Sequence, residues 1–144
     1  PSTTQAIRTR AAVRAAEILG ADLAYIGTRF IASHESGASS EYKQMLVEAG
    51  AADVLYTPNP NGVPANWLRP SLRRHGLDPD HLPPRQEGVR GAGHLPSDVV
   101  PWSNLWSAGQ GVEEIEGVLS VAEIVQALEE GYRAACGVPP FQQA

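Results

Sequence analysis

Two short glycine-containing segments carry the residue types best suited to holding an anion. Gly27 and Thr28 directly follow a short apolar run, and Gly109, Gln110 and Gly111 form a second segment much later in the chain. Glycine lets a ligand approach the backbone closely, and backbone amides together with a threonine hydroxyl can donate to phosphate oxygens without a net positive charge. A glutamine side chain can both donate and accept hydrogen bonds. Each segment is also compatible with an ordinary turn next to a helix or a strand.

The histidines and the cysteine give no comparable pattern. Cys136 is the only cysteine among the 144 residues. The chain can therefore form no disulfide within itself and cannot use a pair of its own thiols in redox chemistry. The spacing typical of paired metal ligands is absent from the histidines, and we expect no metal site. These histidines are His34, His75, His81 and His94.

The residues before the first glycine segment predict a helix and a strand. From Thr4 to Leu19 apolar residues recur at helical spacing, and Gly20 follows as a stop signal. The run from Leu23 to Ile26 is nearly all apolar, which is typical of a strand buried on both faces of a parallel sheet. Gly27 would then lie just past the carboxyl end of a strand, where (β/α)8 barrels place their active sites.

The middle of the chain predicts short elements separated by irregular structure. A helix capped by Ser39 or Ser40 is expected to run to about Ala49, and residues 53–56 to form either a short strand or an extended segment. Prolines and glycines between 58 and 64 argue against regular structure there, and a short helix is expected after Pro70. The stretch 76–101, rich in proline and glycine, predicts a long irregular segment.

The last helix has the best-defined boundaries. Ser120 followed by Glu123 forms a capping box, and Leu119 with Ile124 can form a hydrophobic staple. Gly137 terminates the helix, so a helix over 120–136 is expected. Its buried apolar stripe is expected to consist of Ile124, Val125, Leu128, Tyr132 and Ala135.

The predicted strands do not make a complete sheet. A buried parallel strand needs neighbours on both edges, and the sequence offers only one other weak strand. We therefore expect a partial domain.

Composition limits the function classes. The 144 residues contain 42% hydrophobic residues and carry a formal charge of −5, from 16 acidic and 11 basic side chains. This balance disfavours sequence-independent binding of nucleic acid. The chain has neither the run of about 18 apolar residues that a membrane span requires nor a basic-then-apolar leader, so we expect no membrane insertion and a cytoplasmic location.

Several ordered blocks resemble one enzyme family. The run 20–32, GADLAYIGTRFIA, closely resembles the last-strand segment of nitronate monooxygenases, once called 2-nitropropane dioxygenases. The resemblance continues in the same order through blocks 41–46, 62–71, 76–79 and 105–111. Five blocks in family order are much more specific than any single block.

The resemblance implies an α/β flavoprotein, the C-terminal part of an FMN-binding (β/α)8 TIM barrel with an irregular insertion after the last strand. It further implies an oxidoreductase that oxidises alkyl nitronates with molecular oxygen. The family residues that contact FMN correspond here to Tyr25, Ile26, Gly27 and Thr28, and segment 107–111 resembles the family's Ala-Gly-Gln loop near the flavin, with Gly109 and Gln110. The family's catalytic histidine, and further phosphate-binding glycines, would lie upstream of Pro1, so no catalytic residue is assigned within these residues.

The resulting organisation is a single partial domain over 1–144. Within it, 4–36 is the last helix-strand unit of the barrel, 37–111 an insertion or lid, and 120–136 the C-terminal barrel helix. Residues 59–61, Asn-Pro-Asn, depart from the family pattern, so the sequence leaves the substrate preference open. Two alternatives remain: another FMN barrel such as a flavin-dependent enoyl reductase using NAD(P)H, and a non-catalytic half domain that binds a partner. Homo-oligomerisation is also left open.

Overall fold

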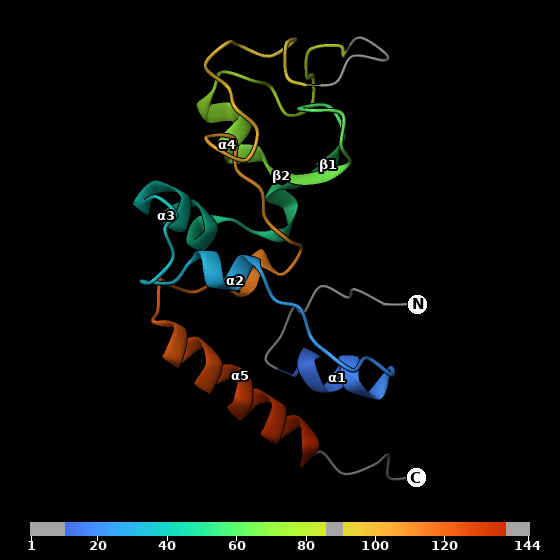
Figure 1. Cartoon of the computed structure of the whole chain (residues 1–144), viewed down its shortest axis with the longest axis vertical. Coiled ribbons are helices and arrows are strands. Elements are labelled where there is room, and N and C mark those ends of the chain that lie inside the picture. Colours follow the sequence, from blue (N-terminus) through green and yellow to red (C-terminus); the bar gives the residue numbers. More distant parts are fainter. Residues whose placement is uncertain (1–10, 86–90, 138–144) are drawn as a thin grey trace.

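A computed structural model describes residues 11–85 and 91–137 of the chain, as a mixed α/β fold in which helices dominate (Figure 1). In Figure 1, β1, β2 and α4 lie at one end of the molecule, α2 and α3 in the middle, and α1 and α5 at the other end. The elements in chain order are α1 (Ala12–Ile18), α2 (Thr28–Ile31), α3 (Ser40–Glu48), the 3-10 turn η1 (Ala51–Asp53), β1 (Val54–Thr57), β2 (Ala65–Leu68), α4 (Arg69–Arg74), the 3-10 turn η2 (Val112–Glu114) and α5 (Val121–Cys136).

The one sheet of the described residues is an antiparallel pair, β1 and β2, in which Val54 opposes Leu68 and Thr57 opposes Ala65. The short strand expected near 53–56 is confirmed as β1. The irregular structure expected between 58 and 64 is also found, as turns and bends, but β2 begins directly after it and was not predicted. Four residues after a proline-rich stretch give little strand signal by themselves, and pairing with β1 is what stabilises them as a strand.

Two buried clusters form the core. One consists of Ala32, Leu46, Ala49, Leu68, Trp106, Ala108, Val112 and Ile115. The other consists of Trp67, Leu72, Leu77, Leu95, Val99 and Leu105. Leu77, Leu95 and Val99 come from the stretch 76–101, so its described residues contribute to the core although they form no helix or strand.

Side-chain caps define two helices as predicted. The Ser39 hydroxyl accepts from the Tyr42 amide at the start of α3. At the start of α5 the Ser120 hydroxyl accepts from the Glu123 amide, while the Glu123 carboxylate accepts from the Ser120 amide, which confirms the capping box. The Glu35 carboxylate also accepts from the Val121 amide at 3.0 Å, which ties α5 to the segment that follows α2. The short helix at Pro70 is confirmed as α4, with the proline in its first turn.

The buried strand predicted over Leu23–Ile26 is wrong for this structure. The segment is irregular, and the side chains of Leu23 and Tyr25 are 90% and 83% exposed. A parallel strand requires hydrogen-bonding neighbours and covered faces, and the described residues supply neither to this segment. An apolar run therefore lies exposed between α1 and α2.

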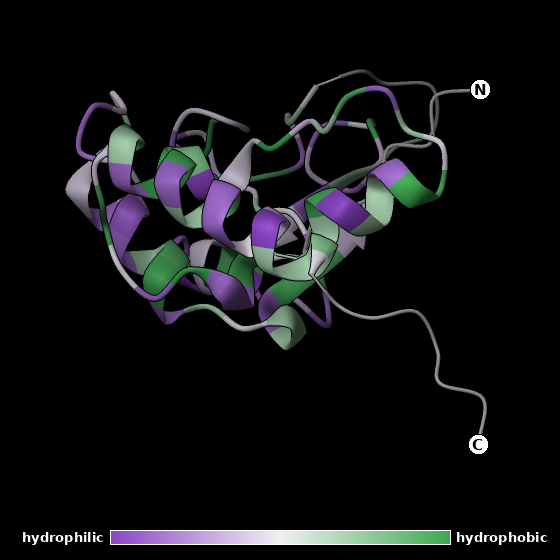
Figure 2. Cartoon of the chain, turned by 90° about the horizontal axis from the view of Figure 1, so that it is seen from below, coloured by the Kyte–Doolittle hydropathy of each residue, from purple (hydrophilic) through white to green (hydrophobic). Residues whose placement is uncertain are grey.

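The helices at this end of the molecule are only partly covered. The described portion of the helix predicted from Thr4 to Leu19 is α1, and residues 4–10 lie outside the described residues. The Tyr132 hydroxyl of α5 donates to the Glu17 carboxylate of α1 at 2.8 Å, so the two helices lie side by side. Ile124 is the buried residue of α5, whereas Val125 is 49% exposed, so the predicted stripe is incompletely covered. Figure 2 shows hydrophobic and hydrophilic stretches alternating along the helices, as amphipathic helices do.

Within the described residues, every helix is too short or too polar to cross a bilayer.

Candidate phosphate-binding site

A small cavity joins the two glycine-containing segments identified in the sequence. Its volume is about 130 Å³. It is lined by Tyr25, Ile26, Gly27, Thr28, Arg29, Gly109 and Gly111. Five of the six residues proposed from the sequence as cofactor contacts therefore lie on one cavity, and Gln110 lies between two lining glycines without lining it.

A direct hydrogen bond holds the two segments together. The Gly109 amide donates to the Thr28 hydroxyl oxygen at 2.8 Å. Because this oxygen acts as an acceptor, the hydroxyl hydrogen of Thr28 is available to donate to another group. A Cβ atom at position 109 would lie 3.1 Å from the same oxygen, which is a tight contact. Glycine at 109 therefore permits the close approach that forms this wall of the cavity.

Gly27 lines the cavity and, without a side chain, leaves open space beside it. Its φ is −106°, so the backbone is in a conformation open to other residues. A Cβ atom at this position would meet no atom of the described chain within 4 Å. A side chain at 27 would thus extend into open space beside the cavity rather than into the protein.

Arg29 is a lining residue that the sequence interpretation did not include. Its Nη1 donates to the Ala32 carbonyl at 3.1 Å, which holds the side chain along α2. Arg29 is the one charged residue among those that line the cavity, and its guanidinium stays protonated. The feature of the sequence that could have indicated Arg29 is its position directly after Gly27 and Thr28.

The donors and the volume fit a phosphate group. Hydroxyl, backbone amide and guanidinium donors are all suited to phosphate oxygens. Pockets that enclose a whole small ligand usually measure about 300–1,000 Å³. A volume of about 130 Å³ accommodates only one end of a cofactor such as FMN, so the ring system would require further walls.

A larger hollow, of about 450 Å³, lies along α3. Its lining includes the carboxylates Glu41 and Glu48 beside Met45 and Pro70. Carboxylates repel a phosphate, so the larger hollow does not suit this anion in spite of its size.

The three histidines with described ring contacts bind protein groups away from the cavity. The His75 ring lies 2.9 Å from the Asn104 carbonyl, the His81 ring 2.8 Å from Asp78, and the His94 ring 3.1 Å from the Asn59 side chain. His34 is exposed and is also not a lining residue. The cavity, as described, thus contains donors for an anion but no histidine base. The same described ranges contain no group of three or more His, Cys, Asp or Glu placed to hold a metal ion.

The tryptophans pack elsewhere. Trp67 and Trp106 are buried, and Trp102, which is 54% exposed, stacks on Trp67 with ring centroids 5.3 Å apart. None of the three lines the cavity.

Comparisons with known proteins show which family and which fold the chain resembles. A family profile described as "Nitronate monooxygenase" matches residues 6–131. The structure of a FabK mutant from Thermotoga maritima is 27% identical with a TM-score of 0.61, and the match covers 90% of this chain and 40% of that one. A second structure of FabK from the same organism is 24% identical with a TM-score of 0.60, covering 90% of this chain and 43% of that one. The chain thus spans about 40% of the length of these solved relatives. A search of curated protein sequences gave no match.

Proposed function

Since the chain belongs to the nitronate monooxygenase family, we propose that it forms the phosphate-binding portion of an FMN-dependent oxidoreductase that oxidises alkyl nitronates with molecular oxygen. The observation that carries the cofactor site is the bond between the Gly109 amide and the Thr28 hydroxyl, which joins two family blocks around one cavity. Either block alone is compatible with an ordinary turn.

The residues of this chain bind and orient the phosphate of the cofactor. The backbone amides of Gly27 and Thr28 and the Thr28 hydroxyl can donate to phosphate oxygens, and Arg29 offsets their negative charge. Tyr25, which is mostly exposed, also lines the cavity. FMN supplies the redox chemistry when bound.

The complete enzyme requires residues outside this chain. The chain spans about 40% of FabK, and its apolar segment at residues 23–26 lies exposed without neighbouring strands among the described residues. We infer that further residues of a longer protein complete a (β/α)8 barrel around this segment and supply the base that abstracts the substrate proton. The 144 residues alone are then expected to show no turnover.

The first test measures the reaction. Oxygen uptake with an alkyl nitronate is recorded for the longest natural chain that contains these residues and, in parallel, for the 144-residue chain with added FMN. We expect turnover from the longer chain only. Equal turnover from both would show that the base lies within these residues, and the assignment of an external base would be wrong.

The same preparation distinguishes the second candidate. A flavin-dependent enoyl reductase, whose phosphate site and Ala-Gly-Gln loop resemble segments 25–28 and 108–110, would consume NAD(P)H in the presence of an enoyl thioester. NAD(P)H consumption with this substrate, without oxygen uptake on nitronate, would favour the reductase.

The cofactor site is tested by Gly27→Asp in the longer chain. The side chain would extend beside the cavity, where a carboxylate would both obstruct and repel the phosphate. We expect the affinity for FMN to fall at least tenfold, about 1.4 kcal/mol, and the flavin absorbance of the purified protein to fall with it. Gly37→Asp is the matched control, because a Cβ atom there also meets open space but Gly37 does not line the cavity. Equal flavin content in both variants would refute the site.

A further inference from the structure

The segment Ser107–Gly111 forms one wall of the cavity and comes from a part of the chain without regular structure, apart from isolated bridges. Two hydroxyl groups from distant elements hold it. Thr28 accepts from the Gly109 amide, and the Tyr42 hydroxyl of α3 donates to the Ser107 carbonyl at 2.5 Å. Ala108, between these two contacts, is 5% exposed and belongs to a core cluster. The wall is thus fixed on both sides of one buried residue.

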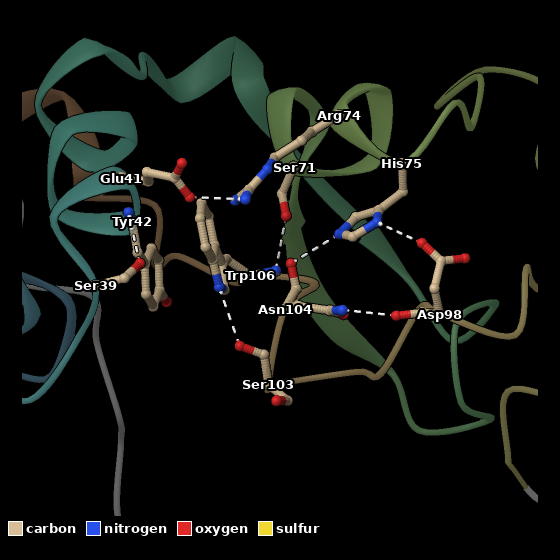
Figure 3. Close-up of polar contacts among 10 residues, drawn as sticks. All are labelled: Ser39, Glu41, Tyr42, Ser71, Arg74, His75, Asp98, Ser103, Asn104 and Trp106. Atoms are coloured by element: carbon tan, nitrogen blue, oxygen red, sulfur yellow. Dashed lines mark hydrogen bonds and ion pairs between the residues drawn. The ribbon is translucent and has the colours of Figure 1, made fainter.

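Tyr42 is itself held in a defined position. The Ser39 hydroxyl accepts from its backbone amide, and its ring stacks on Trp106 with centroids 4.9 Å apart and planes 11° from parallel. Figure 3 shows the Tyr42 and Trp106 rings side by side. Stacking with nearly parallel planes restricts the direction in which the hydroxyl points.

Trp106 is fixed in turn by α4. Its backbone amide donates to the buried Ser71 hydroxyl at 2.8 Å, and the Arg74 guanidinium lies 4.6 Å from the centre of its ring. Glu41 of α3 pairs with Arg74 of α4 at 2.7 Å, so an ion pair links the two helices beside the stack (Figure 3). The ring that supports Tyr42 therefore cannot shift without disturbing several contacts.

Burial raises the pKa of Tyr42 above its usual value near 10, so the hydroxyl remains protonated at neutral pH. A protonated hydroxyl can donate to a carbonyl oxygen.

We propose that Tyr42 is a positioning residue for the phosphate site: its bond to the Ser107 carbonyl holds segment 107–111 against Thr28, so that the cavity is formed before a ligand arrives. The inference rests on the proposed FMN site. Tyr42 does not line the cavity, and its effect on ligand binding would pass entirely through the segment that it holds. A wall fixed in advance lowers the ordering cost of binding.

The test compares Tyr42→Phe with the wild type in the longest natural chain that contains these residues, by titration of the apoprotein with FMN. Phenylalanine keeps the ring stack on Trp106 and removes only the hydroxyl. Loss of one hydrogen bond to the loop is expected to weaken FMN binding about fivefold to tenfold. Hydrogen exchange of the amides in 107–111, measured without FMN, is expected to accelerate by a similar factor.

Ser120→Ala is the matched control. It removes the cap at the Glu123 amide of α5 and leaves the contacts of Tyr42 intact, so it should lower the melting temperature with little change in FMN affinity. Tyr42→Phe that binds FMN as tightly as the wild type would overturn the inference, and so would equal weakening in Tyr42→Phe and Ser120→Ala, since stability would then account for both. A wild type that takes up no FMN refutes the proposed function instead, and the exchange rates of 107–111 still decide whether Tyr42 holds the segment.

Discussion

Ser71 of α4 binds the backbone of Trp106 through its side chain. It is fully buried, and its hydroxyl accepts from the Trp106 amide at 2.8 Å. Ser71→Ala would leave that buried amide without its acceptor, which typically costs about 1–3 kcal/mol. We expect the free energy of unfolding, measured by urea titration, to fall by this amount. Ser103→Ala, at an exposed serine of the neighbouring turn, should change it by less than about 0.5 kcal/mol. Equal effects in the two variants would refute the role of Ser71.

The exposed pair of Asp78 and His81 should make the stability of the fold depend on pH. The hydrogen bond and charge of Asp78 raise the pKa of His81 above its ordinary value near 6.5. A raised pKa means that the pair stabilises the fold while His81 is protonated, fully so below about pH 6.5, and that this contribution is lost as the pH rises through the raised value. Because both side chains are mostly exposed, solvent keeps the effect on stability small.

The shift itself can be measured by NMR titration of His81. Asp78→Asn should lower the titration midpoint of His81 towards its ordinary value, because the partner charge is removed. Asp22→Asn, an exposed carboxylate in another part of the chain, should leave the midpoint unchanged. An unchanged midpoint in Asp78→Asn would mean that the pair does not persist in solution.

Among the elements, α5 depends most clearly on its first turn. The Ser120 hydroxyl accepts from the Glu123 amide, and Glu123 and Glu35 accept from the amides of Ser120 and Val121. Ser120→Ala removes one of these acceptors, and we expect a loss of about 1 kcal/mol in the free energy of unfolding. Ser120→Thr retains a hydroxyl and should lose much less. Similar losses in the two variants would show that the hydroxyl is not what stabilises the helix start.

The substitution Ser120→Ala should leave flavin binding unchanged, because Ser120 does not line the cavity. A loss of FMN in Ser120→Ala beyond that expected from its lower stability would mean that α5 acts on the site directly. In that case the prediction that the start of α5 affects stability but not cofactor binding would be wrong.

At the scale of the whole molecule, exposed apolar side chains gather at the end formed by α1 and the segment after it. Ile18, Leu19, Leu23 and Tyr25 are each at least 66% exposed. In the proposed barrel, Leu23 would be buried between neighbouring strands, and burying a leucine stabilises a fold by about 1.5–3 kcal/mol. In the 144-residue chain the same side chain is 90% exposed and favours self-association.

Leu23→Lys is therefore expected to act in opposite directions in the two contexts. In the 144-residue chain it should reduce aggregation, measured by light scattering, with little effect on the melting temperature. In the longer chain it should destabilise the protein by at least about 1.5 kcal/mol and lower the bound FMN. Val63→Lys, at a loop residue that is 52% exposed, should be neutral in both. A neutral Leu23→Lys in the longer chain would contradict burial of this segment.

The amino-acid sequence by itself determined the elements with local signals. Ser39 defines the start of α3 and Ser120 with Glu123 the start of α5, because the hydrogen bonds involved join residues three apart. The ordered blocks were enough to identify the family, which the profile match to residues 6–131 confirms. The glycine segments at 27 and 109 were also identified, each as a short pattern of residue types.

Only the tertiary structure decided which of these segments meet. The bond from Gly109 to Thr28 joins residues 81 positions apart, and the inclusion of Arg29 in the cavity follows from the path of α2, not from a motif. The same holds for β2, which exists because β1 pairs with it, and for Leu23–Ile26, whose apolar pattern is that of a strand but which lies exposed without neighbours among the described residues. Caps and turns are stabilised by bonds within a few residues, whereas strands and cavity walls are stabilised by partners that the local sequence does not specify.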